Sequence, residues 1–331
     1  MDLNLIESAE NLSVKQAKRI LIVFVLIVIL LILGLEIIEG QRQINSEKLS
    51  SRPEVEVKLP QPQYKKVNYD SYKQWEELFA NYKVDNSGRL LEIPPVKIAE
   101  FPDNMAQINS IAKRKEIFFN IVAIGAYHAN KRILEQRGKI TQLANQYYVF
   151  GHLGAGSKRW LKEKFATYNV EQTDDWLNSI KKLKKRIDII PLSIILAQAA
   201  SESGWGTSRF ATQANNIFGE WTFDPDEPGI VPKRRPADAS YKIRKFSSIE
   251  AAINSYLLNL NTHFAYSKLR EIRFELRRQG KKLDPLQLSA GLIKYSEKRG
   301  EYVEQINNII KYNDLEEFDK LLRDLSTPDW N

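Results

Sequence analysis

The chain has 331 residues, of which 43% are hydrophobic, and its 49 Lys and Arg against 41 Asp and Glu give a net charge of +8. This composition indicates a folded protein of one large or two modest domains. The absence of cysteine excludes a disulfide scaffold, a thiol nucleophile and any cysteine-ligated metal site, and three widely separated histidines argue against a histidine-rich metal centre.

The first feature in chain order is an uncharged apolar run over residues 20–35, and apolar residues continue to position 38 after a single glutamate. Because about 20 apolar residues cross the hydrocarbon core of a bilayer, residues 20–38 are predicted to form one transmembrane anchor. Three basic residues stand just before it, so the positive-inside rule predicts that residues 1–19 remain in the cytoplasm as a tail and that the rest is exported. A cleaved signal peptide is the alternative, but the sequence after the run offers no good cleavage site.

The exported region is predicted to begin with a proline-rich tether over residues 39–102, with a short helix near 69–83 inside it. Residues 103–186 follow as a helical N-terminal part. Apolar residues spaced three and four apart predict one helix from Asn104 and a second over 128–146.

Residues 187–315 are predicted to form the second, also mostly helical, domain. Its segment 222–246 contains four prolines and two short β-like runs, which favours a β-hairpin or a long loop. Ser247 and Glu250 have the spacing of a capping box that opens the next helix. Residues 316–331 are expected to be a C-terminal tail.

One helix of this domain ends on a carboxylate. Pro191 suits its first turn, its residues are almost all apolar or small, and Glu202 continues the apolar stripe just before a helix stop at Gly204. Burial and the negative end of the helix dipole both raise a carboxyl pKa. A glutamic acid that stays protonated near neutral pH is what general-acid cleavage of a glycoside requires. A glutamate that faces solvent or pairs with a base is the alternative.

The run AQAASESGWGTSRFATQANNIFGEW, with HF and KYSEKRGEYVEQI further on, resembles the bacterial Bax-type glucosaminidases. These belong to a group of peptidoglycan-cleaving N-acetylglucosaminidases, and their domain is often called mannosyl-glycoprotein endo-β-N-acetylglucosaminidase-like. The likeness covers roughly residues 97–312, and ESGWGTSRFA and NNIFG together are its specific motifs. It implies an α+β, mostly α, lysozyme-like fold with a small β-hairpin. It also implies that Glu202 protonates the leaving glycosidic oxygen.

The resemblance further implies a set of substrate contacts. An N-x-F-G turn borders the substrate groove in the family, and aromatic residues face the site or stack on sugars. Core packing is the alternative for each aromatic residue. The predicted substrate-binding residues are Trp205, Asn216, Phe218, Trp221, Tyr256, Tyr295 and Tyr302.

The sequence leaves the second catalytic carboxylate open. Relatives are expected to carry a glutamate on the hairpin after the N-x-F-G turn. Asp238 lies closest to that position and is the predicted partner of Glu202, and the substrate's own 2-acetamido group is the alternative. Basic residues of the same segment are expected either to grip acidic peptides of peptidoglycan or to be solvated. The other acidic residues available are Glu220, Asp224, Asp226 and Glu227.

These features predict a single-pass protein of the inner membrane whose periplasmic domain hydrolyses the β-1,4 bond after N-acetylglucosamine in the glycan strands of peptidoglycan. No metal, cofactor or nucleic-acid partner is expected. A lytic transglycosylase and a non-catalytic wall-binding scaffold are the rival predictions. The segment 151–158 resembles a P-loop, but its order G-x4-G-S-K departs from that motif, and we expect a turn there.

Overall fold

The computed structural model describes residues 64–233, 235–236 and 239–325. The predicted cytoplasmic tail, the predicted transmembrane segment 20–38 and Asp238 lie outside the described residues. Among the helices of these described ranges, none is long and apolar enough to cross a membrane. The chain divides into two compact units. In the smaller one, which comprises residues 1–58 and 145–158, only a helix end, a turn and a helix start are described.

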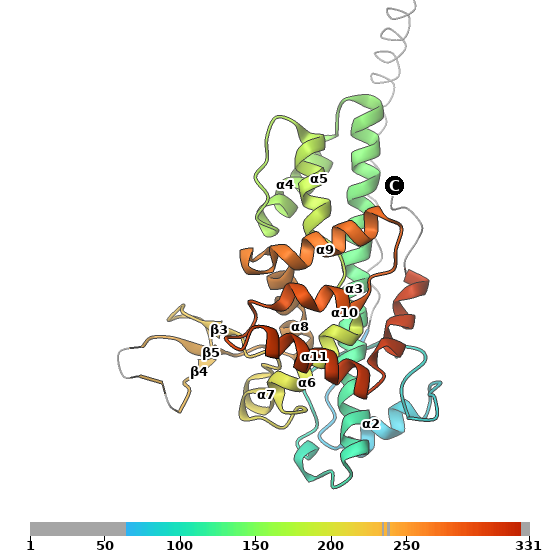
Figure 1. The fold of residues 1–331 in the computed structure, drawn as a ribbon, viewed down its shortest axis with the longest axis vertical. Coiled ribbons are helices and arrows are strands. Elements are labelled where there is room, and N and C mark those ends of the chain that lie inside the picture. Colours follow the sequence, from blue (N-terminus) through green and yellow to red (C-terminus); the bar gives the residue numbers. More distant parts are fainter. Residues whose placement is uncertain (1–63, 234, 237–238, 326–331) are drawn as a thin grey trace, which may run out of the picture. The chain divides into compact units, whose positions relative to one another are not determined.

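The larger unit is mostly helical and carries a small antiparallel sheet, which confirms that part of the predicted fold class (Figure 1). The α-helices are α2 (Tyr72–Phe79), α3 (Ile111–Phe150), α4 (Ala155–Thr167), α5 (Trp176–Arg186), α6 (Leu192–Ser203), α7 (Arg209–Ala214), α8 (Ile249–Thr262), α9 (Ser267–Arg278), α10 (Pro285–Ser289) and α11 (Gly300–Tyr312). The short 3-10 segments are η2 (Met105–Gln107), η3 (Phe264–Tyr266), η4 (Ala290–Leu292) and η5 (Leu315–Leu325).

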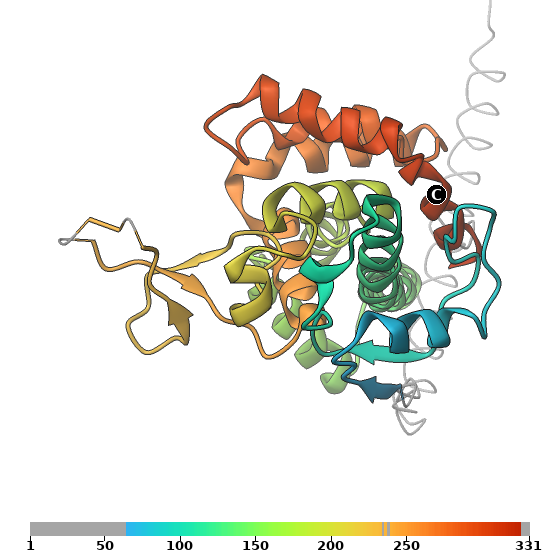
Figure 2. The ribbon, with the colours of Figure 1, turned by 90° about the horizontal axis from the view of Figure 1, so that it is seen from below.

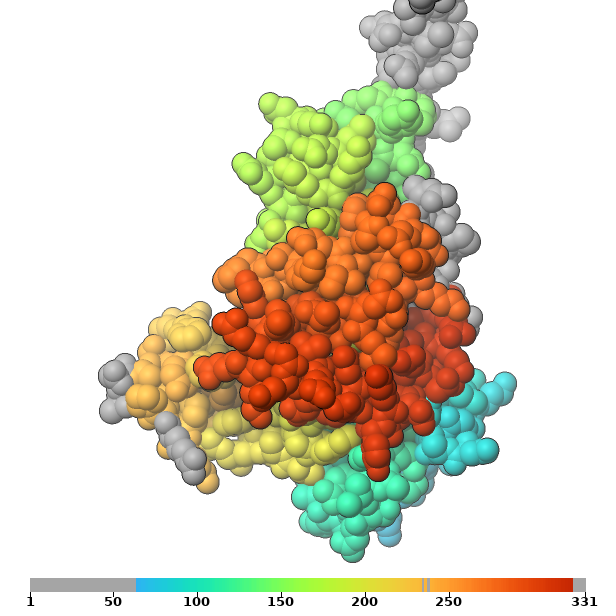
Figure 3. All heavy atoms as spheres, in the orientation of Figure 1, coloured from blue at the N-terminus to red at the C-terminus, as the bar shows by residue number. Residues whose placement is uncertain are grey.

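The strands form two separate sheets. In the first, β1 (Lys65–Val67) and β2 (Val96–Ile98) pair in parallel. In the second, β5 (Lys242–Arg244) lies between β3 (Trp221–Thr222) and β4 (Gly229–Ile230), and both pairings are antiparallel. This second sheet is the β-hairpin region that the sequence predicts. Figure 3 shows this region projecting at one side of the unit, beside the face that α9 and α11 cover.

Residues 64–102 differ from the predicted tether. Helix α2, which begins with a capping box between Ser71 and Gln74, lies within the short helix predicted near 69–83, whereas the strands β1 and β2 were not predicted. Trp75 is fully buried, and Phe79 and Ile98 are nearly so. The prolines of this segment border the folded elements, so proline content alone misled the prediction, and the apolar residues between them were the better guide.

Helix α3 is continuous where the sequence predicts two helices. Residues 117–126 are all buried, because several segments pack on this stretch, among them Phe101, Trp205 and helix α8. A methyl group added at Gly125 would lie only 2.7 Å from the side chain of Ile253. The helix following the hairpin also begins one residue later than predicted: Ser248, not Ser247, caps α8 by accepting a hydrogen bond from the main-chain N–H of Ala251 at 3.0 Å.

Helix α6 packs against α10, α11 and η5 and lies near the middle of the unit in the view of Figure 2. Ten of its 12 residues are buried, as expected for a helix that is apolar nearly all round. Its first turn is held by Asp319 of η5, whose carboxylate accepts hydrogen bonds from the main-chain N–H of Ser193 at 3.0 Å and from its hydroxyl at 2.6 Å.

A buried ionic cluster fixes the segment that leads into α6. Asp188 is 2% exposed. Arg277 donates to its carboxylate at 3.2 Å, and Arg137 and Arg273 approach it to 3.9 Å. Burial alone would raise the pKa of Asp188, but the three guanidinium groups hold that pKa below its ordinary value. Arg273 also donates to the carbonyl groups of Asp188 and Ile189, so α9 holds the chain just before α6 begins.

We predict that Asp188→Asn lowers the free energy of unfolding by about 3–5 kcal/mol, because it leaves buried guanidinium groups without their counter-charge. The effect depends on pH. The folded-state pKa of Asp188 lies below the ordinary value of 3.8, so its contribution is present above that value and is lost as the pH falls through the folded-state pKa.

Urea unfolding at pH 7 measures this difference. Glu275→Gln is the control, because Glu275 is an exposed carboxylate that pairs with Arg278, and its unfolding midpoint should match that of the parent. An unchanged midpoint for Asp188→Asn would contradict the role assigned to the cluster.

Candidate active site

Glu202 lies in the last turn of α6 and is half-buried. The chain leaves the helix through three consecutive residues with positive φ, namely Gly204, Trp205 and Gly206, and Ser203 supports this turn by accepting a hydrogen bond from the N–H of Gly206 at 2.9 Å. The helix end therefore brings a carboxyl group out of an apolar core to its margin. Burial raises the pKa of Glu202 above its ordinary value.

A directed chain of hydrogen bonds ends on this carboxyl group. The hydroxyl of Tyr256 donates to the side-chain oxygen of Gln198 at 2.5 Å. The amide of Gln198 donates to the hydroxyl of Tyr302 at 2.9 Å, and that hydroxyl donates to Oε1 of Glu202 at 2.9 Å. Because Gln198 lies one turn before Glu202 on α6, the helix itself orients the tyrosine that contacts its own last turn.

This last hydrogen bond favours the ionised carboxylate and so lowers the pKa of Glu202, against the larger effect of burial. Burial also raises the pKa values of Tyr256 and Tyr302 far above their ordinary value. Both hydroxyls therefore keep their protons at neutral pH and act as fixed donors.

Stacked aromatic rings tie three segments together around Glu202. Tyr295 stacks on Tyr302 with ring centres 5.3 Å apart, and Phe218 stacks on Tyr256 at 3.9 Å. The hydroxyl of Tyr295 donates to the carbonyl of Phe218 at 3.0 Å. These contacts join α8, α11 and the N-x-F-G turn.

Gly219 of that turn lies close to the carboxyl group of Glu202. Its φ is +71°, and a methyl group added there would lie 3.7 Å from Oε2 of Glu202. The turn therefore brings its main chain next to Glu202.

Asn216 holds the turn in place. Its amide donates to the carbonyl groups of Glu220 and Arg244 at 2.8 Å, and its oxygen accepts from the N–H of Glu220 at 3.0 Å. It is 1% exposed, so its side chain is engaged inside the protein. Asn216 thus connects the turn to β5 instead of offering a free amide to a ligand.

The predicted substrate-binding residues differ widely in exposure. Phe218, Tyr256 and Tyr302 are buried like Asn216, and Trp205 and Tyr295 are half-buried. Trp221 on β3 is 53% exposed and stacks on Tyr241 with ring centres 4.3 Å apart. Among the predicted substrate-binding residues, Trp221 is therefore the most exposed, and the sequence analysis did not single out its partner Tyr241.

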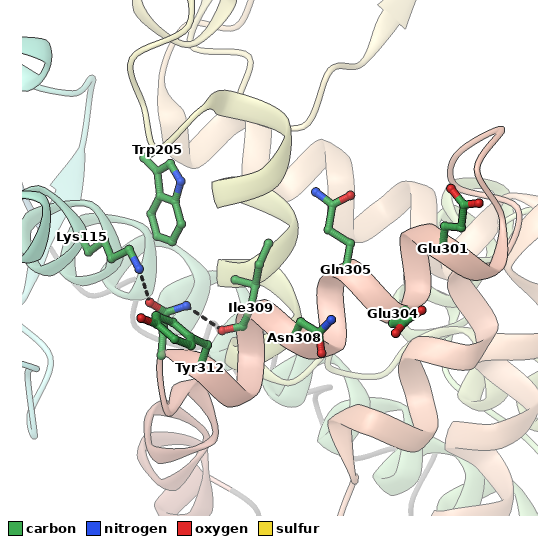
Figure 4. Close-up of a pocket in the computed structure, with 9 residues that line it drawn as sticks. Lys115, Trp205, Glu301, Glu304, Gln305, Asn308, Ile309 and Tyr312 are labelled. Carbon is green, nitrogen blue, oxygen red and sulfur yellow. Dashed lines mark hydrogen bonds between the residues drawn. The ribbon is translucent and has the colours of Figure 1, made fainter.

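Trp205 points away from the tyrosine network. Its indole packs edge-on against Phe118 and Phe119 of α3, and the ammonium group of Lys115 lies 4.7 Å from its ring centre. The other face of this residue lines a cavity along α11 (Figure 4). The sequence leaves two roles open for Trp205, core packing or contact with a ligand. Its indole packs on α3, and the residue also lines the cavity.

The predicted second carboxylate, Asp238, lies outside the described residues. Of the described alternatives, Asp224 and Asp226 are exposed, and Glu227 pairs with Arg244 at 2.5 Å. Glu220 follows Gly219 directly. It accepts a hydrogen bond from Ser255 at 2.7 Å, its Oε1 is buried without a hydrogen-bond partner, and burial raises its pKa to about 7.

Two partners of the site were missed from the sequence. Gln198 carries a detectable signal, because it lies four residues before Glu202 on the same helix and is the polar interruption of an apolar stretch. Ser255 carries none, since a lone serine on a helix is usually solvated. In the described ranges, no group of three or more His, Cys, Asp or Glu residues has an arrangement suited to a metal ion.

Comparison with known proteins adds independent information. The family described as mannosyl-glycoprotein endo-beta-N-acetylglucosaminidase matches residues 177–315. This match starts ten residues before the predicted domain boundary at 187 and ends at the same residue. No solved structure matches the chain.

Two curated proteins are similar to this chain. Protein bax of Escherichia coli (strain K12) is 31% identical over 214 residues, which cover 62% of this chain and 72% of that protein. The exo-glucosaminidase LytG of Bacillus subtilis (strain 168) is 28% identical over 168 residues, which cover 45% of this chain and 53% of LytG. The family match and the likeness to Protein bax agree with the resemblance found in the sequence motifs, and the chain therefore belongs to the glucosaminidase family.

Proposed function

We propose that this chain hydrolyses the β-1,4 glycosidic bond after N-acetylglucosamine in the glycan strands of peptidoglycan, with Glu202 as the general acid. The observation that carries the proposal is the position of Glu202 at the end of a buried helix, where burial raises its pKa and Tyr302 donates a hydrogen bond to it. Membership of the glucosaminidase family supports the class of bond that is cleaved.

In this mechanism, the carboxyl proton of Glu202 moves to the glycosidic oxygen as the bond between that oxygen and C1 of the sugar breaks. A water molecule supplies the hydroxyl group that C1 gains. The Glu202 carboxylate left behind keeps the hydrogen bond from Tyr302, which stabilises its new charge. The main chain at Gly219 borders this carboxylate and leaves room for the sugar that a side chain there would fill.

Activation of the water requires a second group. Among the described carboxylates, Glu220 is the candidate that the structure favours, since it adjoins Gly219 and has a pKa near 7. A base with that pKa accepts a proton readily at neutral pH. The acetamido group of the substrate is the alternative, and Asp238 remains the sequence-based candidate.

The remaining parts of the proposal rest on the sequence. Residues 20–38 would anchor the chain in the inner membrane, residues 1–19 would stay in the cytoplasm, and the catalytic domain would lie in the periplasm. The mostly helical unit, with Glu202 at a helix end beside a small sheet, supports a lysozyme-like fold. Protease added to spheroplasts tests the topology: it should degrade the catalytic domain and spare the tail, and protection of the domain would contradict it.

We predict that Glu202→Gln lowers the rate of peptidoglycan hydrolysis by about 10²–10⁴-fold, because the amide has no acidic proton to give. Mass spectra of the digest should contain products that end in reducing N-acetylglucosamine for the parent chain only. Glu275→Gln is the matched control, as the same change at an exposed carboxylate on α9, and should leave the rate unchanged.

The same assay discriminates the other possibilities. Anhydro-sugar products would identify a lytic transglycosylase, and a folded chain that binds the wall without forming products would identify a scaffold. Either result contradicts the proposal. Glu220→Gln in this assay tests the second carboxylate: a loss as large as that of Glu202→Gln assigns it, and an unchanged rate excludes it in favour of Asp238 or the acetamido group.

We predict that Tyr302→Phe shifts the alkaline limb of the pH profile of kcat/KM to higher pH. The hydrogen bond from Tyr302 lowers the pKa of Glu202, so its loss raises that pKa and keeps the general acid protonated further into the alkaline range. Phenylalanine preserves the stacking on Tyr295. Tyr168→Phe, a change at another buried tyrosine, should leave the limb in place. An unmoved limb, or one moved to lower pH, in Tyr302→Phe would contradict the assignment of Glu202 as the acid.

A further inference from the structure

A groove with a volume of about 480 Å³ runs along α11, between that helix, the start of α3 and the turn after α6 (Figure 4). It is not part of the tyrosine network. Part of its wall, at Lys115, belongs to α3 and lies outside the residues that the glucosaminidase family matches. The residues that line it include Lys115, Trp205, Glu301, Glu304, Gln305 and Tyr312.

One end of the groove adjoins the candidate active site. Glu301 directly precedes Tyr302, whose hydroxyl contacts Glu202. The side chain of Gln305 donates to the hydroxyl of Ser201, the residue before Glu202, at 2.9 Å. The groove and the candidate site therefore share the end of α6 and the first turns of α11 as their common wall.

The two ends of the groove carry opposite charges. Glu301 and Glu304 are exposed at the end near the site, and Lys115 stands at the other end. Among the ion pairs of the residues that the structure describes, none includes these three side chains. Both charges are thus available to a ligand.

The ammonium group of Lys115 is positioned by contacts with uncharged side chains. Its ammonium group donates to the side-chain oxygen of Asn313 at 2.8 Å and lies 4.7 Å and 5.1 Å from the ring centres of Trp205 and Tyr312. These contacts orient the cation without neutralising it. A carboxylate that reaches this end gains a charge-assisted hydrogen bond from a donor that is already positioned.

The dimensions and charges select an extended peptide. From residue 301 to residue 312, α11 rises about 16 Å at 1.5 Å per residue, which an extended chain of about four or five residues spans. A peptide with an amino group towards one end and a free carboxylate at the other matches the two charged ends. Glycan alone carries no such pair of opposite charges.

We propose that this groove binds the short peptide attached to the glycan strand of peptidoglycan, with Lys115 receiving its free carboxylate and Glu301 and Glu304 the side-chain amino group of a diamino residue, because the terminal nitrogen of the peptide is held in the amide to the sugar. The inference rests on the proposed function for its choice of substrate. It adds that the chain discriminates peptide-bearing glycan from bare glycan through a site built partly outside the family domain.

The test compares two substrates for the full chain: intact peptidoglycan, and glycan strands from which an amidase has removed the peptides. The parent chain should hydrolyse the peptide-bearing substrate with a KM about 5-fold lower, as expected for one or two exposed charge pairs. Lys115→Met and Glu304→Gln should each reduce this preference. Lys311→Met, with the same loss of charge on an exposed residue of α11 outside the groove, should retain it. Equal KM values for both substrates in the parent chain would overturn the proposal.

A second measurement separates this proposal from the proposed function. The free peptide released by the amidase is titrated into the parent chain and into Lys115→Met, with the fluorescence of Trp205 as the signal, assigned by Trp205→Phe. Binding that weakens about 5-fold in Lys115→Met supports the groove even if no glycan is hydrolysed. No binding to the parent chain overturns the groove, whether or not glycan is hydrolysed.

Discussion

The burial of helix α6 on all sides is the constraint on which the rest of this structure depends. Within this helix, Gln198 has polar side-chain partners in Tyr256 and Tyr302, and both ends of the helix must satisfy free main-chain groups. At the start, Asp319 accepts hydrogen bonds from Ser193, and the cluster around Asp188 fixes the chain that leads in. At its C-terminal end, the helix stops at Gly204, which has a left-handed main-chain conformation. The position of α6 therefore fixes the position of the Glu202 carboxyl group at the edge of the core.

Two opposing effects then determine the proton affinity of Glu202. Burial favours the neutral acid, and the hydrogen bond from Tyr302 favours the carboxylate; burial is the larger, so the pKa is raised. The smaller effect is still useful to an acid catalyst, because the same hydroxyl stabilises the charge that appears once the proton has left. Gln198 keeps that hydroxyl pointed at Glu202, which makes the arrangement a preorganised one.

The central helix and its acidic end could be predicted from local pattern alone, since an apolar stripe that stops at glycine leaves little freedom for the residue before it. The contacts around Glu202 could not be derived from local pattern, because Tyr256 on α8 and the segment with Tyr295 and Tyr302 are far from Glu202 in the chain and meet it only in the folded unit. The family resemblance, and not local pattern, named these three tyrosines. Proline content suggested an extended tether over residues 39–102. The described part of that segment instead contains the buried side chains Trp75 and Phe79. For Asn216, motif likeness predicts a substrate contact, and the structure adds that its amide connects the turn to β5.

A general acid at position 202 must keep its proton at a pH above the ordinary pKa of a glutamic acid. A ¹³C NMR titration of the chain labelled at glutamate carboxyl carbons measures this directly, with the Glu202 signal assigned by its absence in Glu202→Gln. We predict a midpoint for Glu202 above the ordinary value of 4.5. A midpoint at or below 4.5 would contradict the assignment of Glu202 as a general acid.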